Sequence, residues 1–204
     1  MKNSVLVVGS VALDDIETIS GSKNDVIGGS AVYFSFAGSF FSNVRLVGVA
    51  GSDFPEEIIK KMQSRNIDTQ GLQIKEGKTF KWGGKYHEDM NGRDTLYTHL
   101  NVFENFSPQI PKKFKKTPYI FLGNIQPELQ LKVLEQVENP DFIALDTMNL
   151  WINEKKEDLL KVISKVDLIA INQTELTDLT DEDNLIKGIK YLHEQLKVKY
   201  IIIK

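Results

Sequence analysis

Cysteine is absent from the 204 residues of this sequence, and histidine occurs only three times. The first absence excludes disulfide bonds, catalysis by a thiolate and zinc sites built from cysteine. The histidines, His87, His99 and His193, do not have the spacing of a metal site. No apolar run approaches the ~20 residues that span a bilayer, and the chain starts with one lysine and a strand pattern rather than a signal peptide. We therefore expect a cytoplasmic protein with no membrane partner.

An excess of positive charge is likewise missing. Lysine and arginine number 25 against 28 aspartates and glutamates, which gives a net charge of −3. Domains that bind nucleic acids carry a basic face, so we expect no nucleic-acid partner. The one dense basic cluster contains four lysines between positions 112 and 116, and the flanking Pro111 and Pro118 favour a solvated loop there.

Two common nucleotide-binding signatures are also missing. No G-x-G-x-x-G occurs in the sequence. The run Gly77-Lys78-Thr79 resembles the end of a phosphate loop, but Gly71 stands one residue too far away for that motif. A strand pattern then follows where the motif requires a helix. Both signatures are therefore excluded.

Short apolar runs alternate with amphipathic segments along most of the chain. The run at 4–9 is apolar almost throughout, which is typical of a strand buried on both faces. We expect further strands at 44–49, 72–76, 118–122, 141–145, 167–171 and 199–203. We expect helices at 29–42, 55–65, 127–137, 154–165 and 182–196, with Ser52 or Asp53 capping the second. Alternating strands and helices predict a doubly wound, mostly parallel α/β sheet with helices on both faces.

One stretch breaks this alternation. Polar and apolar residues alternate at 79–87 and again at 95–103, and Asn91-Gly92 between them is a strong turn signal. This pattern predicts an antiparallel hairpin outside the parallel sheet. An ordinary antiparallel extension of the main sheet is the alternative.

Polar side chains follow several of the expected strands: Asp14, Asp15, Asn124, Asp146, Asn149, Asn172 and Glu175. In open α/β sheets, ligands bind beyond the carboxyl ends of the strands. One carboxylate can accept hydrogen bonds from two neighbouring hydroxyls. Asp14 is therefore a candidate ligand contact, and Asp15 is expected to face solvent. The alternative for Asp14 is an aspartate in a surface turn.

Gly28 and Gly29 open the expected helix at 29–42, which carries small and aromatic residues at helical spacing, including Phe41. Without a Cβ atom, both glycines let the backbone approach a ligand closely. The start of the helix would then offer unpaired N–H groups and the positive end of its dipole. The alternative is a tight turn before a helix of the core.

The region resembles the N-terminal signature of the ribokinase-like (PfkB) kinases of sugars and nucleosides. The resemblance rests on Gly28, Gly29, Ala31, Ser35, Ser42 and the run Gly51-Ser52-Asp53. Tyr33 stands where the family usually has asparagine. The resemblance implies a sugar or nucleoside as the small-molecule partner. It also implies substrate-binding residues, namely Asp14, Gly28, Gly29, Tyr33, Asn124 and Asn149.

Asn172-Gln173-Thr174-Glu175 matches the N-x-x-E motif of the same family. The match implies ATP as cofactor, bound with Asn172 and Glu175, and Mg²⁺ served by Glu175 through water. Mg²⁺ prefers oxygen ligands and keeps several waters. On the residues alone, the same spacing can simply start a helix.

Asp146 and Asn149 resemble the family's D-x-x-N segment. Asn149 would then face nucleotide or substrate, and Asp146 would hold the loop. The resemblance also implies a monovalent cation in the complete protein.

The hairpin and the segment before the glycines resemble the family's β lid, which covers the sugar site and in some members pairs two subunits. Lid segments are therefore expected at about 12–20 and 77–103, and a homodimer through them is one expected assembly. His87 and Arg93 would reach the substrate when the lid closes. A solvated hairpin tip is the alternative for both residues.

The family's G-A-G-D motif does not occur in this sequence. Its glycines form an anion hole at the start of a helix, and its aspartate is the catalytic base. We therefore expect no catalytic residue among these 204 and expect the base to lie beyond residue 204. We also expect residues 1–204 to form an incomplete ribokinase-like domain that lacks the C-terminal part of the fold. The expected function is ATP-dependent phosphorylation of a sugar or nucleoside hydroxyl, with the 204-residue chain inactive alone. The alternative is a non-catalytic α/β module that binds sugars or nucleosides.

Overall fold

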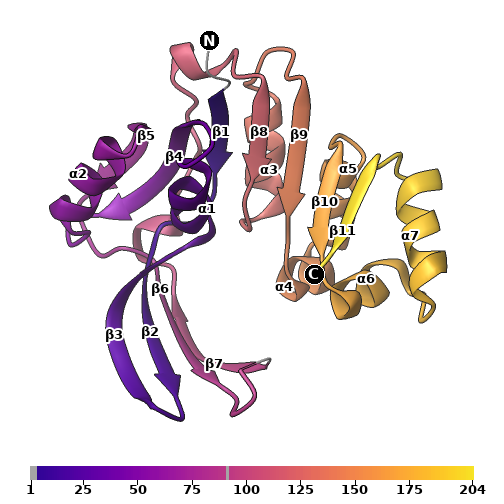
Figure 1. The fold of residues 1–204 in the computed structure, drawn as a ribbon, viewed down its shortest axis with the longest axis horizontal. Coiled ribbons are helices and arrows are strands. Elements are labelled where there is room, and N and C mark those ends of the chain that lie inside the picture. The colour runs from indigo at the N-terminus through magenta and orange to yellow at the C-terminus, as the bar shows by residue number, and fades with distance from the viewer. Residues whose placement is uncertain (1–3, 91) are drawn as a thin grey trace. The chain divides into compact units, whose positions relative to one another are not determined.

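Residues 4–90 and 92–204 are described by a computed structural model, drawn in Figure 1. The chain divides into two units. The first comprises Met1–Val8 and Pro108–Lys204, and the second comprises Gly9–Ser107. Among the described residues, no helix is both long enough and apolar enough to cross a membrane.

The main sheet has seven strands. In order across the sheet they are β11 (Tyr200–Ile203), β10 (Leu168–Ile171), β9 (Phe142–Asp146), β8 (Tyr119–Leu122), β1 (Ser4–Val8), β4 (Asn43–Gly51) and β5 (Ile67–Lys75). Pairing is parallel from β1 through β8, β9 and β10 to β11 in the first unit, and between β4 and β5 in the second. This parallel α/β sheet with its helices confirms the fold class that the sequence predicts.

The first unit packs its helices around apolar strands. Its helices are α3 (Pro127–Leu134), α4 (Asn149–Glu154), α5 (Lys156–Ile163), α6 (Gln173–Thr180) and α7 (Leu185–Glu194), with a short 3₁₀ helix, η2 (Lys112–Phe114). α3 packs against α5, and α6 packs against both α4 and α7. The buried side chains are mostly aliphatic, as in Leu6, Ile120, Leu122, Leu145, Leu159, Ile163 and Ile169. The sequence does not predict α4, and it gives the start of α6 only as the alternative for Asn172 and Glu175.

In the second unit, α1 (Ser30–Gly38) packs on β4, and α2 (Glu56–Ser64) packs on β5. A 3₁₀ helix, η1 (Asn101–Phe103), also contacts β4. The expected cap of α2 is wrong, because its N-cap residue is Pro55 and no side chain caps it. Asp53 instead accepts hydrogen bonds from the main-chain N–H of Thr79 at 2.8 Å and from its hydroxyl at 2.6 Å.

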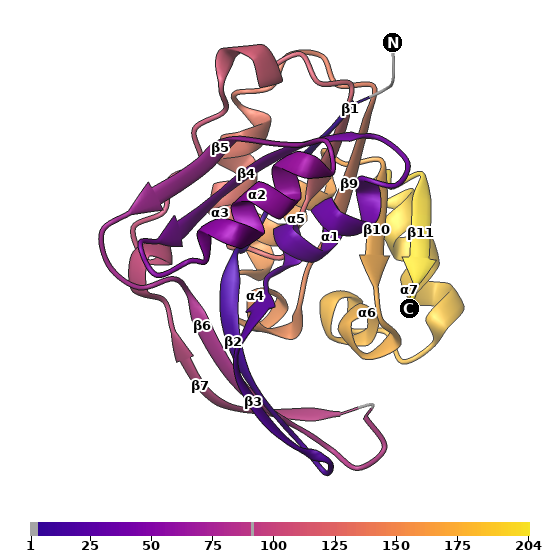
Figure 2. The same cartoon turned by 60° about the vertical axis from the view of Figure 1, so that its left-hand side comes forward.

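A second, smaller sheet lies within the second unit, apart from β4 and β5, and is clearest in Figure 2. Its order is β3 (Gly21–Gly28), β2 (Ala12–Thr18), β6 (Lys81–Tyr86) and β7 (Arg93–His99). β6 and β7 pair antiparallel, as the hairpin pattern predicts, and β2 pairs parallel with β6. Asn91 of the expected turn lies outside the described residues. Next to it, the N–H of His87 donates to the carbonyl of Gly92 at 2.9 Å.

The region around the two glycines differs from the prediction in two ways. α1 ends at Gly38 instead of Ser42, and Phe41 is 89% exposed rather than buried. Turn hydrogen bonds from Phe40 to Ala37 and from Phe41 to Gly38 close the helix early. In addition, β3 is a strand that the sequence does not predict, because its first five residues are exposed and show no apolar alternation.

Candidate functional site

Asp14 lies in β2, where the pairing with β3 shifts register between Asp14 and Ile16. Its carboxyl group sits directly over Gly28 of β3. A Cβ atom added to Gly28 would lie 2.0 Å from Oδ2 of Asp14, closer than any van der Waals contact allows. Gly28 therefore makes room for this carboxyl group, and any larger residue would displace it.

The Asp14 carboxyl is half-buried and only partly satisfied. The main-chain N–H of Trp82 donates to it, but Oδ1 is buried and has no hydrogen-bond partner among the described residues. Burial raises the pKa of Asp14 to about 6, and the charge of Asp15 adds to the rise while the bond from Trp82 opposes it. Buried polar atoms in folded proteins are nearly always paired. Oδ1 is therefore an acceptor that is available to a ligand.

Tyr33 lies near Asp14. The hydroxyl of Tyr33, in α1, donates to the carbonyl of Ile27 at 3.1 Å, and its side chain is 58% exposed. Burial of the hydroxyl raises the pKa of Tyr33, as do the nearby charges of Asp14 and Tyr86. Tyr33 therefore fits beside the carboxyl with its hydroxyl anchored to the backbone and its ring partly open.

Gly29 is the N-cap residue of α1 and has φ of 97°, a conformation that favours glycine. A Cβ atom there would lie 2.3 Å from the carbonyl oxygen of Ser10. The N–H of Ser30 donates to the Ser10 hydroxyl at 3.0 Å, and the N–H of Ala31 donates to the Ser10 carbonyl at 3.1 Å. The expectation of unpaired N–H groups at this helix start is therefore wrong for these two donors, which Ser10 satisfies.

The sequence predicts that Asp15 faces solvent, but its carboxylate is bonded to three neighbouring groups. Its carboxylate accepts from the Tyr97 hydroxyl, from the N–H of Asp25 at 2.8 Å and from the Lys81 ammonium at 3.0 Å. Burial alone would raise the pKa of Asp15, but these bonds outweigh it and lower the pKa. Lys81 also pairs with Asp25 at 2.7 Å. Asp14 has an open acceptor, whereas Asp15 is fully engaged with its neighbours.

The hairpin residues that the sequence singles out have partners within the hairpin. Nε2 of His87 lies 3.2 Å from Asp94 Oδ1. The guanidinium of Arg93 lies over the Trp82 ring, 5.7 Å from its centroid. Trp82 and Tyr86 were missed by the sequence reasoning. The signal was present, because residues 82 and 86 of a strand share one face.

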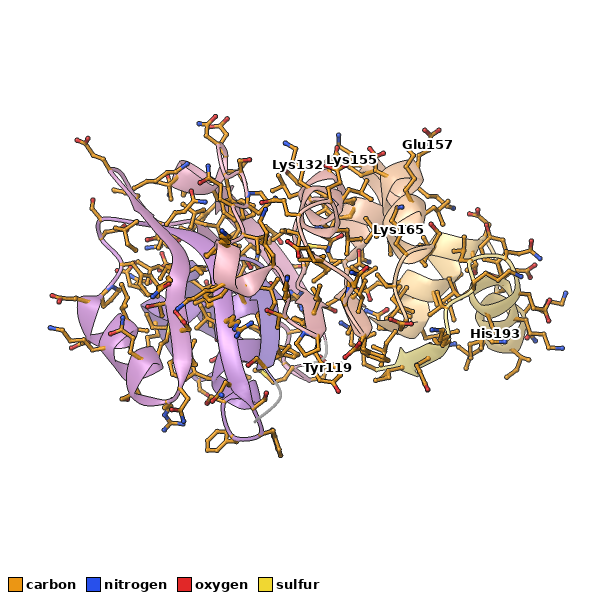
Figure 3. All side chains as sticks on the ribbon, turned by 90° about the horizontal axis from the view of Figure 1, so that it is seen from above. Tyr119, Lys132, Lys155, Glu157, Lys165 and His193 are labelled. Carbon is orange, nitrogen blue, oxygen red and sulfur yellow. The ribbon has the colours of Figure 1, made fainter. Side chains whose placement is uncertain are left out.

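In the first unit, two of the polar residues at the strand ends have side-chain partners elsewhere in that unit. Asn124, after β8, accepts from the indole N–H of Trp151 at 2.8 Å. Asp146, at the end of β9, pairs with Lys204 at 2.7 Å. Asn149 is the first residue of α4. His193, labelled in Figure 3, lies on α7 with Nδ1 2.9 Å from the carbonyl oxygen of Val198.

Asn172 and Glu175 start α6 with a reciprocal capping box. Oδ1 of Asn172 accepts from the N–H of Glu175 at 2.8 Å, and Oε2 of Glu175 accepts from the N–H of Asn172 at 3.0 Å. Glu175 is only 5% exposed. The helix-start alternative is thus present in the structure. Any contact of Asn172 or Glu175 with nucleotide or metal must therefore be compatible with the capping box.

The structure brings Asp14, Gly28 and Tyr33 together in the second unit. It also brings Asn172 and Glu175 together in the first. Among the described residues, no group of three or more histidines or carboxylates is arranged to hold a metal ion directly.

Comparison with known proteins gives one family. The family model described as pfkB family carbohydrate kinase matches residues 21–204. No curated protein sequence matches the chain.

Solved structures share the fold at low sequence identity. A putative ribokinase II from E. coli in its apo form has a TM-score of 0.80 and 14% identity, over 99% of this chain and 72% of its own. A ribokinase from Cryptococcus neoformans in complex with ADP has a TM-score of 0.75 and 19% identity, over 98% and 71%. A nucleoside kinase from Burkholderia thailandensis in complex with inosine has a TM-score of 0.73 and 14% identity, over 98% and 69%.

Proposed function

Because the chain belongs to the pfkB family of carbohydrate kinases, we propose that it binds a sugar or nucleoside through Asp14 for phosphorylation by ATP. The observation that carries this proposal is the buried Oδ1 of Asp14, which has no partner among the described residues. Two adjacent substrate hydroxyls would donate to this carboxylate, one to each oxygen. Charge-assisted hydrogen bonds of this kind are short and strong, so they would fix the substrate's orientation.

The other substrate residues have supporting roles in this proposal. Gly28 leaves the space in which the Asp14 carboxyl lies. Gly29, with its positive φ, is the N-cap residue at which the chain enters α1. Tyr33 borders the same carboxyl. Asn124 and Asn149 follow strand ends of the first unit, where doubly wound sheets bind ligands. The inosine complex of the nucleoside kinase supports a substrate of this size and chemistry.

On the phosphate side, we assign Asn172 and Glu175 to ATP and Mg²⁺. Bound Mg²⁺ would neutralise charge on the phosphates during transfer. Direct coordination by Glu175 would compete with its hydrogen bond to the N–H of Asn172. A water-mediated contact leaves the capping box intact and suits an ion that keeps several waters. The ADP complex of the fungal ribokinase supports the choice of nucleotide.

We also propose that the 204-residue chain alone does not transfer phosphate. No G-A-G-D occurs in it, so the general base that the family resemblance implies is not among its residues. General base catalysis is typically worth ~10²–10⁴-fold in rate. The same observation favours the second candidate function, a module that binds a sugar or nucleoside without phosphoryl chemistry.

Calorimetry and an ADP-release assay on the same samples test both parts. We expect Asp14→Asn to weaken binding of the best sugar or nucleoside in a panel by ~1–3 kcal/mol. Glu17→Gln is the matched control, because Glu17 lies on the same strand and pairs with Lys85 at 2.7 Å on the surface. Equal affinity in Asp14→Asn and the parent chain contradicts the assignment of Asp14. Substrate-dependent ADP release by the 204-residue chain contradicts the second part and directs attention to Asp146.

A further inference from the structure

The aromatic side chains of Tyr33, Trp82 and Tyr86 bear on the chemical class of the substrate. Trp82 and Tyr86 each lie two residues from Gly84, so all three lie on one face of β6. The same strand donates the N–H of Trp82 to the Asp14 carboxyl. Tyr33 approaches the carboxyl from α1, close enough for the charges of Asp14 and Tyr86 to raise its pKa. The Tyr33 side chain of α1 therefore lies near the Asp14 carboxyl and near Tyr86 of β6.

The Trp82 ring is packed against neighbouring groups and does not offer an open face to a ligand. A Cβ atom on Gly84 would lie 1.8 Å from the Trp82 ring, so the indole covers this glycine. The indole N–H donates to the Thr95 hydroxyl at 3.1 Å, and the Arg93 guanidinium lies over the ring. Tyr86 packs edge-on to the indole at 84°, with centroids 6.5 Å apart. Trp82 thereby positions the Tyr86 ring.

Tyr33 is the more open of the rings. Its hydroxyl is already committed to the Ile27 carbonyl, whereas 58% of the side chain is exposed. The anchored hydroxyl holds the ring in place without loss of the exposed face. Ordered aromatic rings with free faces stack on planar ligand groups.

Asp14 combines an open acceptor with a partly exposed aromatic side chain beside it, that of Tyr33. A free sugar has hydroxyls around its whole ring, and each one that is buried without a partner costs affinity. Asp14 supplies a strong acceptor, whereas the Tyr33 hydroxyl already donates to the Ile27 carbonyl. They suit a ligand that places two adjacent hydroxyls at one end and a flat, weakly polar group at the other.

We propose that the substrate class is the nucleosides, with the ribose hydroxyls on Asp14 and the base against the rings of Tyr33 and Tyr86. This inference rests on the proposed function, since it concerns the same site. It makes Tyr33 a residue that determines specificity. It also gives the tyrosine a role at a position where the family usually has asparagine.

The test is calorimetry of the 204-residue chain with adenosine, with inosine and with ribose, which lacks a base. We expect the better nucleoside to bind at least tenfold more tightly than ribose. We expect Tyr33→Leu to weaken the nucleoside on the order of tenfold, because stacking on one aromatic ring has about that worth, and to leave ribose unchanged. Tyr33→Phe keeps the ring and should retain most of the nucleoside affinity. Phe41→Leu is the control, since Phe41 is 89% exposed and follows the same helix.

The outcomes separate this inference from the proposal beneath it. If ribose binds as tightly as the nucleosides, or if Tyr33→Leu leaves nucleoside affinity unchanged in a folded protein, the nucleoside assignment is overturned. The Asp14 assignment still stands in either case if Asp14→Asn weakens binding. If Asp14→Asn changes nothing, or no ligand of the panel binds, both are overturned. A thermal melt of each variant establishes that it is folded.

Discussion

Asp14 opposes folding at neutral pH, because its pKa in the folded protein is about 6 against 3.8 for the unperturbed group. Between these values the folded protein retains a proton that the unfolded chain has released. The free energy of unfolding therefore falls as the pH rises from about 4 to 6, and the cost is fully present above about 6. A residue that costs stability in this way is typical of a ligand site.

We predict that Asp14→Asn stabilises the protein at pH 7.5 while it weakens ligand binding. The expected gain is ~1 kcal/mol, less than the full shift implies because the carboxyl remains partly open to solvent. The gain should shrink at pH 4, where the parent carboxyl is largely protonated. Urea unfolding at both pH values measures it. A variant that is less stable than the parent at pH 7.5 would show that the carboxyl has a structural role.

At the scale of single residues, the sequence predicts positions better than environments. Asp14 and Gly28 stand out from their place after a strand and before a helix. Their contact does not, because it depends on the pairing of β2 with β3. Tyr86 becomes a candidate site residue only when β6 is known to pair with β2. The engagement of Asp15 with Tyr97 depends in the same way on strands far apart in sequence.

At the scale of elements, two substitutions of Glu175 at the start of α6 separate its capping role from its proposed role toward Mg²⁺-ATP. Glu175→Gln retains an oxygen that can accept from the N–H of Asn172, so the capping box survives. Glu175→Ala removes that acceptor and should lower the free energy of unfolding by ~1 kcal/mol. We predict that Glu175→Gln has near-parent stability but weaker binding of Mg²⁺-ATP, measured by calorimetry.

The control is Glu157→Gln, in the first turn of α5 and labelled in Figure 3. It makes the same change of charge near another helix start. If Glu175→Gln binds Mg²⁺-ATP as tightly as the parent chain does, capping alone explains this glutamate.

Elements with a strong apolar period are predicted well, and those that depend on tertiary pairing are not. β1 and β8 follow from apolar runs that are buried as parallel strands. β3 has no such pattern and exists because β2 offers it a partner. α1 is overextended in the prediction because Phe41 continues the apolar spacing, yet its side chain is exposed.

At the scale of the whole molecule, β11 is the last strand at one edge of the main sheet. Its side chains include Tyr200 and Ile202, which are 56% and 51% exposed. Apolar edge strands are templates for pairing with another chain. We predict that the 204-residue chain associates through this edge and that Ile202→Lys reduces the association seen by light scattering. Ile186→Lys, which changes an equally exposed isoleucine on α7, should not reduce it. A monodisperse parent chain would contradict this prediction.

The central claim is that the Asp14 carboxylate accepts the substrate's hydroxyls, and proton release on binding tests it most directly. Ligand hydroxyls bind the ionised carboxylate, so binding at pH 6 should release roughly half a proton per ligand from a group whose pKa is about 6. Calorimetry at pH 6 in two buffers with different ionisation enthalpies measures this release for the tightest ligand of the panel. We predict that release in the parent chain and none in Asp14→Asn. Binding without proton release, or the same release from both proteins, would contradict it.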